Sequence, residues 1–114
     1  MSDAVTDLAV IRDRDLATCQ AMLQEGSKSF SAAALLLPGW MRAPVAALYA
    51  FCRMADDIID EGGTAEGLAE LSTRLDLIYA QTPQDHPVDR AFSHVVRDYD
   101  IPRPVLDLLL EGFA

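Results

Sequence analysis

Apolar residues recur along this chain at intervals of three and four, the spacing of an α-helix, and no stretch shows the convincing alternation of a strand. Five residues of the first stretch share one helical face: Leu16, Cys19, Leu23, Ser27 and Phe30. This stripe predicts a first helix that begins at Asp13 or Asp15, either of which is a suitable N-cap, and that ends near Ser27. Residues 1–12 are expected to form a polar tail in front of it.

A longer helix is predicted from the segment Trp40–Pro44 to residue 60 or 61, where the pair Gly62-Gly63 ends it. Nearly every face of this helix is apolar between Val45 and Cys52. A helix without a polar face has to be covered, so we expect other elements to surround it.

Three further helical segments follow. Thr64 is the candidate N-cap of a helix over 65–81, and Asp85 is the candidate N-cap of a helix that ends near Tyr99. The last segment, Pro104–Ala114, is apolar and still helical where the sequence stops. The prediction is an all-α chain with a helical domain over residues 13–114, and the abrupt end suggests a truncated chain.

Length and charge narrow the classes of function. A chain of 114 residues suits one domain, and its 18 acidic and 9 basic residues give a net charge of -9. Such a surface argues against nucleic acid as a partner and against simple electrostatic binding to anionic lipid. The N-terminus lacks the layout of a signal peptide, and no apolar run is long enough to span a membrane, so a cytoplasmic location is expected. Cys19 and Cys52 are interpreted as small buried thiols.

One face of the long helix carries the candidate chemistry. At 100° per residue, Tyr49, Arg53, Asp56 and Asp60 fall within a sector about 60° wide, with Asp57 beside them. We call these five residues the acidic stripe. Carboxylates one turn apart repel each other and oppose the dipole at a helix C-terminus, whereas oxygen ligands in that arrangement suit Mg²⁺.

The alternative is an exposed acidic helix end that pairs with Arg53, because spacing alone proves little. The spacing D-x-x-x-D also occurs at Asp3/Asp7 and at Asp85/Asp89. The first pair lies in the predicted tail and the second straddles Pro87 at a helix start. Neither pair is therefore expected to share an apolar, inward face.

Other polar and aromatic residues have simpler interpretations. His86 and His94 are expected to be surface histidines. For Trp40 and Met41, packing in the core is favoured over a peripheral contact with a membrane. Arg42 is left with two alternatives, a contact to phosphate or a cap on the preceding turn.

The segment Tyr49–Asp60 resembles the first aspartate-rich motif of the squalene/phytoene synthases: a tyrosine, then C-R, A-D-D and a third aspartate. Further elements resemble that family's landmarks in the same order: Ser27-Lys28-Ser29-Phe30, Leu36-Leu37-Pro38, Pro87-Val88, Tyr99-Asp100-Ile101-Pro102 and Glu111-Gly112. The wording A-F-C-R-x-A-D-D-I is most similar to the bacterial phytoene synthase branch.

The resemblance implies an isoprenoid-synthase-type bundle of helices around an apolar cavity. It also implies a prenyltransferase that condenses two prenyl diphosphates head to head in carotenoid or isoprenoid biosynthesis. In the phytoene branch, geranylgeranyl diphosphate yields phytoene through a cyclopropylcarbinyl diphosphate. Two alternatives stay open: a related synthase that forms presqualene or hydroxysqualene intermediates, and a non-catalytic helical module derived from the family.

The resemblance also assigns roles to the acidic stripe. Asp56 and Asp60 match the family's metal ligands for Mg²⁺, with Mn²⁺ as a substitute, and Asp57 is expected to act behind them without touching the metal. Arg53 and Tyr49 match catalytic residues that bind substrate, the arginine at the diphosphate and the tyrosine in the cavity.

Upstream, Ser27 and Phe30 match a substrate-binding pair. The family often has histidine before them, where this sequence has Gly26. A second aspartate-rich helix of the family has no counterpart in these 114 residues. We therefore expect that the chain lacks the C-terminal part of the same fold and does not turn over substrate alone.

Overall fold

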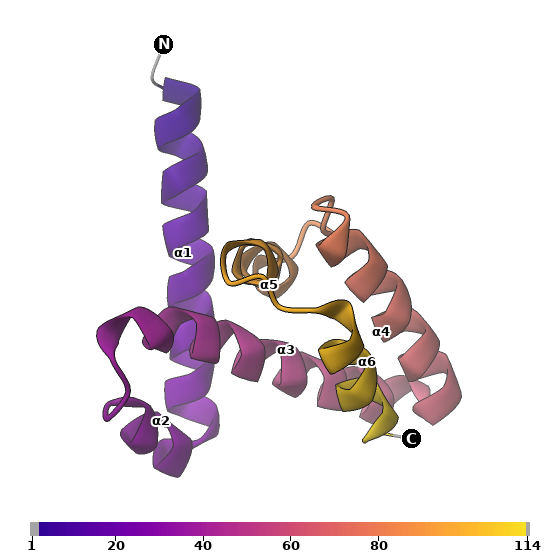
Figure 1. Ribbon diagram of the computed structural model, residues 1–114. Helices are drawn as coiled ribbons and strands as arrows, with labels where there is room; N and C mark the ends of the chain where they lie inside the picture. Colours follow the sequence, from indigo (N-terminus) through magenta and orange to yellow (C-terminus); the bar gives the residue numbers. More distant parts are fainter. Residues whose placement is uncertain (1–2, 114) are drawn as a thin grey trace.

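The computed structural model describes the backbone of residues 3–113 and the side chains of residues 10–113. Within that part of the chain every regular element is a helix, which confirms the all-α prediction. The helices are α1 (Asp3–Gly26), α2 (Lys28–Ala34), α3 (Gly39–Gly62), α4 (Thr64–Tyr79), α5 (Pro87–Asp98) and α6 (Arg103–Glu111) (Figure 1). None of these helices is both long and apolar enough to cross a membrane.

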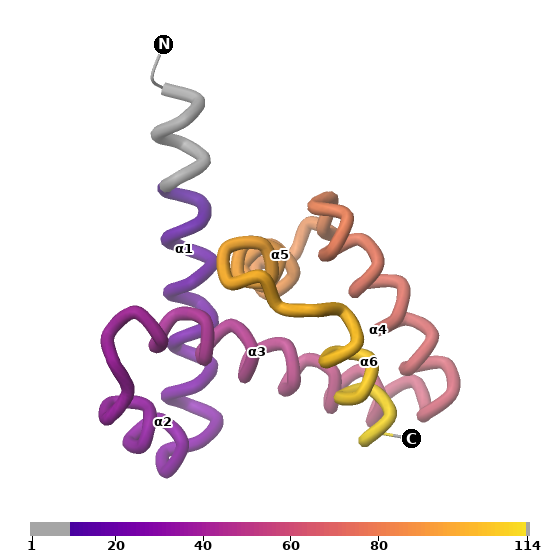
Figure 2. Tube along the Cα trace, in the orientation of Figure 1, coloured from indigo at the N-terminus to yellow at the C-terminus, as the bar shows by residue number. Residues whose placement is uncertain are grey.

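Helix α3 is the centre of the packing. It crosses α1 and runs on to α4, while α5 is seen nearly end-on between α1 and α4 (Figure 2). Its buried residues include Ala47, Ala50 and Ala55, whose small side chains let α1, α4 and α5 come close. The ring of Phe51 stacks on Phe92 of α5, with centroids 4.9 Å apart. The expectation that neighbours surround α3 holds on most sides, but Leu48 is exposed.

The helix ends depart from the sequence prediction in three places. Helix α1 begins at Asp3, so residues 3–12 are helical; no Gly or Pro interrupts them, and the suitable N-caps farther along do not stop the helix. Whether 1–12 is a separate tail from a domain over 13–114 stays a prediction, since helical backbone does not define a domain boundary. Gly63, with φ of 87°, occupies the N-cap position predicted for Thr64.

The start of α5 is also shifted. His86 is its N-cap, because Nδ1 of His86 accepts a hydrogen bond from the backbone N–H of Val88 at 3.1 Å. The prediction that Asp85 caps this helix is therefore wrong. Pro87, at the first position of the helix, needs no hydrogen-bond acceptor there.

A proline inside α3 explains the role of Tyr99. Pro44 has no N–H, so the carbonyl of Trp40 lacks its donor within the helix. The Tyr99 hydroxyl donates to that carbonyl at 3.2 Å. The rings of Tyr99 and Trp40 also stack, with centroids 6.1 Å apart. Trp40 is 64% exposed, so the prediction that it packs in the core is wrong.

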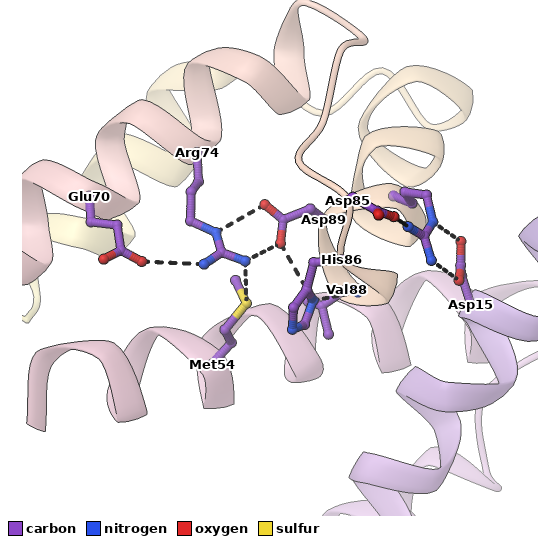
Figure 3. Close-up of polar contacts among 9 residues, drawn as sticks. Asp15, Met54, Glu70, Arg74, Asp85, His86, Val88 and Asp89 are labelled. Atoms are coloured by element: carbon purple, nitrogen blue, oxygen red, sulfur yellow. Dashed lines mark hydrogen bonds and ion pairs between the residues drawn. The ribbon is translucent and has the colours of Figure 1, made fainter. Parts of the chain in front are cut away.

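Buried or partly buried ion pairs join α5 to α4 and to α1 (Figure 3). Nε of Arg74, on α4, donates to Oδ2 of Asp89 at 3.0 Å. Arg90 donates through Nε and Nη2 to the two carboxylate oxygens of Asp15, at 2.8 and 3.0 Å. The side chain of Asp89 has no exposed surface. Asp85 is fully exposed, so the pair Asp85/Asp89 does not share an inward face, as expected, although Asp89 itself is buried.

Candidate functional site

The four charged residues of the acidic stripe lie on the exposed side of α3, in its last three turns, while Tyr49 lies before them and is half-buried. This is the arrangement described by the alternative of an exposed acidic helix end that pairs with Arg53. Nε of Arg53 is 3.9 Å from Oδ1 of Asp57, and these side chains are 55% and 59% exposed. Such a contact contributes little to stability. Among the side chains of residues 10–113, Asp56 and Asp60 make no hydrogen bond or ion pair, so their oxygens are available to a ligand.

The stripe borders an open pocket of about 270 Å³. Its lining consists of Arg53, Asp56, Asp57, Ile59, Asp60 and Phe113. The pocket therefore combines carboxylates and a guanidinium from α3 with an aromatic ring brought in by the end of α6. Phe113 could not be predicted from the sequence, because only the turn after α5 places α6 beside this part of α3.

The donor set fits a hard divalent cation, but as part of a coordination shell. Asp56 and Asp60 present unpaired carboxylates one helical turn apart, which suits Mg²⁺ that keeps waters and shares its shell with phosphate oxygens. Within the described residues, no three His, Cys, Asp or Glu side chains are arranged to hold a metal ion by themselves. The site is therefore half of a metal centre at most.

The upstream residues meet the stripe through its tyrosine. The rings of Phe30 and Tyr49 lie with centroids 5.7 Å apart, tilted by 33°. Ser27 does not continue the stripe of α1: its Oγ accepts the backbone N–H of Phe30 at 3.2 Å and caps α2. The structure thus brings Phe30 to Tyr49, while Ser27 holds the turn that carries Phe30.

The remaining candidates are not part of this site. Nη2 of Arg42 donates to the carbonyl of Leu35 at 3.2 Å, so the turn-capping alternative accounts for its position. His86 is exposed, whereas burial lowers the pKa of the partly buried His94, with Arg97 and Arg12 acting in the same direction.

The two thiols differ in burial. Burial, with a smaller effect of Asp15, raises the pKa of Cys19 to about 12, so this thiol is neutral and inert near neutral pH. Cys52 is half-buried, and burial followed by the charge of Asp56 raises its pKa as well. The prediction of a buried thiol is confirmed for Cys19 and is only partly right for Cys52.

The structure is thus an all-helical packing around α3, with carboxylates and a guanidinium along one exposed face of that helix. The family model for squalene/phytoene synthase matches residues 23–114. The chain therefore belongs to the squalene/phytoene synthase family, as its motifs predicted. In general terms this family acts on prenyl diphosphates and depends on divalent metal ions.

Curated relatives agree. The chain is 45% identical over 109 residues to a phytoene synthase of Rhodobacter capsulatus, covering 92% of this chain and 32% of that protein. It is 47% identical over 116 residues to a phytoene synthase of Cereibacter sphaeroides, covering 92% and 33%. The chain thus spans about a third of the length of the relatives it matches.

A solved structure supports the fold. The crystal structure of a dehydrosqualene synthase in complex with ligand matches with a TM-score of 0.77 and 33% identity, covering 90% of this chain and 36% of that one. This agreement confirms the predicted isoprenoid-synthase-type bundle, of which the chain matches a part.

Proposed function

We propose that this chain supplies the first aspartate-rich half-site of a prenyltransferase that joins two prenyl diphosphates head to head. The proposed substrate is geranylgeranyl diphosphate and the proposed product is phytoene, because the two relatives cited above are phytoene synthases. One observation carries the proposal: Arg53, Asp56 and Asp60 line a single pocket, and neither aspartate has a hydrogen-bond or ion-pair partner among the side chains that the structure describes.

The residues of the chain divide the work in this proposal. Asp56 and Asp60 would hold Mg²⁺, or Mn²⁺ in its place, and Asp57 keeps Arg53 beside them. When bound, the metal neutralises the charge of the departing diphosphate. Arg53 donates hydrogen bonds to diphosphate oxygens.

The aromatic residues act on the other end of the substrate. Tyr49 and Phe30 form an apolar wall beside the charged residues of the stripe. Such a wall excludes water from a reactive cation. Ser27 supports Phe30 through the cap of α2. The second set of metal ligands would come from a C-terminal part of the same fold, as the greater length of the relatives suggests.

The experiment is a calorimetric titration with the thiolo-diphosphate analogue of geranylgeranyl diphosphate, which does not ionise. We expect Mg²⁺-dependent binding that weakens about tenfold or more in Asp56→Asn/Asp60→Asn, the loss of about 1.4 kcal/mol. Asp85→Asn is the control, because Asp85 is also an exposed aspartate but lies outside the pocket. Mg²⁺-dependent binding that survives the double substitution would contradict the proposal.

A related synthase that forms presqualene or hydroxysqualene is the second candidate, favoured by the likeness to a dehydrosqualene synthase. The higher identity to the two phytoene synthases ranks it lower. A non-catalytic helical module is the third. Reading the encoding DNA beyond Ala114 separates the module from both synthases. A continuing frame with a second D-x-x-x-D helix supports an enzyme, and a stop codon supports the module.

We also propose a peripheral membrane contact at the turn between α2 and α3, in a cytoplasmic protein. Leu35, Leu36 and Trp40 are all exposed there. No acidic residue occurs between Gly26 and Ala55, although the chain as a whole carries a net charge of -9. This local absence of negative charge removes the repulsion from anionic lipid expected of the whole chain. Flotation with phosphatidylglycerol vesicles, for wild type and Leu36→Ser/Trp40→Ser, tests this contact: co-flotation that the substitutions abolish supports it, and wild type that stays at the bottom refutes it.

A further inference from the structure

The close approach of Tyr49 to the end of α1 depends on a residue without a side chain. Gly26 is the last residue of α1, and a Cβ built on it would overlap the hydroxyl oxygen of Tyr49. The same Cβ would lie 3.2 Å from Cζ and 3.4 Å from Cε1 of the Tyr49 ring. The phenol therefore occupies space that every other amino acid at position 26 would fill.

The opposite constraint on Tyr49 comes from α2. Its ring lies against Phe30, whose backbone N–H is held by the Oγ of Ser27 at 3.2 Å. Gly26 and Phe30 both lie at the junction of α1 and α2, and Tyr49 of α3 lies against both of them. A phenol pushed out of the notch at Gly26 cannot keep the same contact with Phe30.

We propose that Gly26 is a positioning residue for Tyr49, which it admits into a notch at the end of α1. The proposal rests on the proposed function, in which Tyr49 belongs to the substrate-facing stripe one turn before Arg53. Gly26 acts only through Tyr49: it sets where the aromatic wall begins relative to the guanidinium and the two metal-binding carboxylates.

The chain contains a matched control for a substitution at this position. Gly62 is the last residue of α3, as Gly26 is of α1, and a Cβ on Gly62 would meet nothing within 4 Å. Gly62→Ala therefore reproduces the change in backbone entropy at a helix end without touching any neighbour. A difference between Gly26→Ala and Gly62→Ala isolates the contact with Tyr49.

The direct readout is the environment of the Tyr49 ring. In chain labelled with 3-fluorotyrosine, the three tyrosines give three ¹⁹F signals, assigned by Tyr-to-Phe substitution, with Tyr79 and Tyr99 as internal references. We expect Gly26→Ala to shift the Tyr49 signal and to leave the other two in place, whereas Gly62→Ala moves none. A folded Gly26→Ala variant with an unchanged Tyr49 signal overturns the proposal.

Rescue gives a second readout that does not depend on Gly26→Ala being stable. We expect Gly26→Ala to lower the melting temperature by about 4 °C or more in the wild-type background. In the Tyr49→Phe background, where the overlapping hydroxyl is gone, less than half of that loss should remain. An equal loss in both backgrounds, or failure of Gly26→Ala/Tyr49→Phe to fold when Tyr49→Phe folds, overturns the proposal.

Ligand binding separates this inference from the function on which it rests. With the thiolo-diphosphate analogue and Mg²⁺, Gly26→Ala should weaken binding in the wild-type background. It should weaken binding less in the Tyr49→Phe background, where the ring is kept and the overlapping hydroxyl is gone. Additive losses count against Gly26 acting through Tyr49. If wild type binds no analogue, the proposed function fails, while the ¹⁹F shift and the rescue still decide the role of Gly26.

Discussion

Two aspartate pairs with identical spacing have opposite environments in this protein. Asp56 and Asp60 lie on the exposed face of α3 without an ion-pair partner among residues 10–113, whereas Asp89 is fully buried and bound by Arg74 of α4. Asp85, the other aspartate of that pair, is fully exposed and contacts Arg90. The spacing puts Asp56 and Asp60 on one face of α3, whereas Asp85 lies before the start of α5 and only Asp89 is in that helix. Neighbouring helices then decide whether a carboxylate meets water or a counter-ion.

Asp89 has a structural role, whereas Asp56 and Asp60 have the properties of a binding site. A buried carboxylate that is neutralised by arginine has no free charge for a cation, so Asp89 can serve only the packing of α4 and α5. The exposed pair has the opposite properties: it contributes nothing to the core, and its charge is available to a ligand. Free charge on an ordered helix, rather than acidity or spacing, is what marks the candidate site.

The largest expected effect follows from removing the counter-ion of Asp89. Arg74→Met leaves a carboxylate that has no exposed surface unpaired, and we expect the free energy of unfolding to fall by about 3–5 kcal/mol. Urea unfolding followed by circular dichroism measures the loss. The double variant Arg74→Met/Asp89→Leu is the control, and it should recover most of the stability because no charge is left buried. A loss below about 1 kcal/mol in the single variant would place Asp89 with the exposed aspartates after all.

A second prediction concerns the buried thiol of Cys19 on α1 and the dependence of stability on pH. The pKa of Cys19 is raised to about 12 against an ordinary value of 9.0. Between these values the unfolded chain loses the thiol proton and the folded chain keeps it, so stability falls as pH rises from 9 to 12. The slope is about 1.4 kcal/mol per pH unit.

Cys19→Ala should remove this alkaline contribution, which urea unfolding at a series of pH values would show as a shallower decline than in wild type. Cys52→Ala is the comparison, because that thiol is only half-buried. An identical alkaline decline in wild type and Cys19→Ala would contradict the assigned burial.

The smallest expected effect has the opposite sign. Asp56→Asn/Asp60→Asn removes repulsion within the acidic stripe and negative charge near the C-terminus of α3, so the free energy of unfolding should rise by about 0.3–1 kcal/mol. Thermal melts at low ionic strength measure the gain, which salt should diminish. Destabilisation by the double substitution would show that these carboxylates have structural partners.

The sequence predicts the local features of this fold, such as helix ends and helix faces, but few of the contacts between helices. The ends of α3 and the placement of Tyr49, Arg53, Asp56 and Asp60 on one face follow from periodicity and from Gly62-Gly63 alone. The extra helix α2 was not predicted, because Ser27 lies at helical spacing from Leu23 and its capping role depends on the backbone geometry at that residue.

Burial of Asp89 was missed, although a signal existed. Asp89 lies three residues before Phe92 and Arg74 lies three residues after Leu71, so each charge sits on the apolar stripe of its own helix. Opposite charges on two apolar stripes indicate a buried pair. Phe113 left no comparable signal, since its place beside the acidic stripe depends on how α6 packs.

The role proposed for Asp56 and Asp60 depends most on where a divalent ion binds when a diphosphate is present. The direct measurement is paramagnetic broadening of backbone amide signals in ¹⁵N-labelled chain, with substoichiometric Mn²⁺ and inorganic pyrophosphate. We predict broadening centred on residues 53–60 that Asp56→Asn/Asp60→Asn abolishes, with the amides of residues 85–89 unaffected. Broadening centred on 85–89, or unchanged in the double variant, would contradict the account.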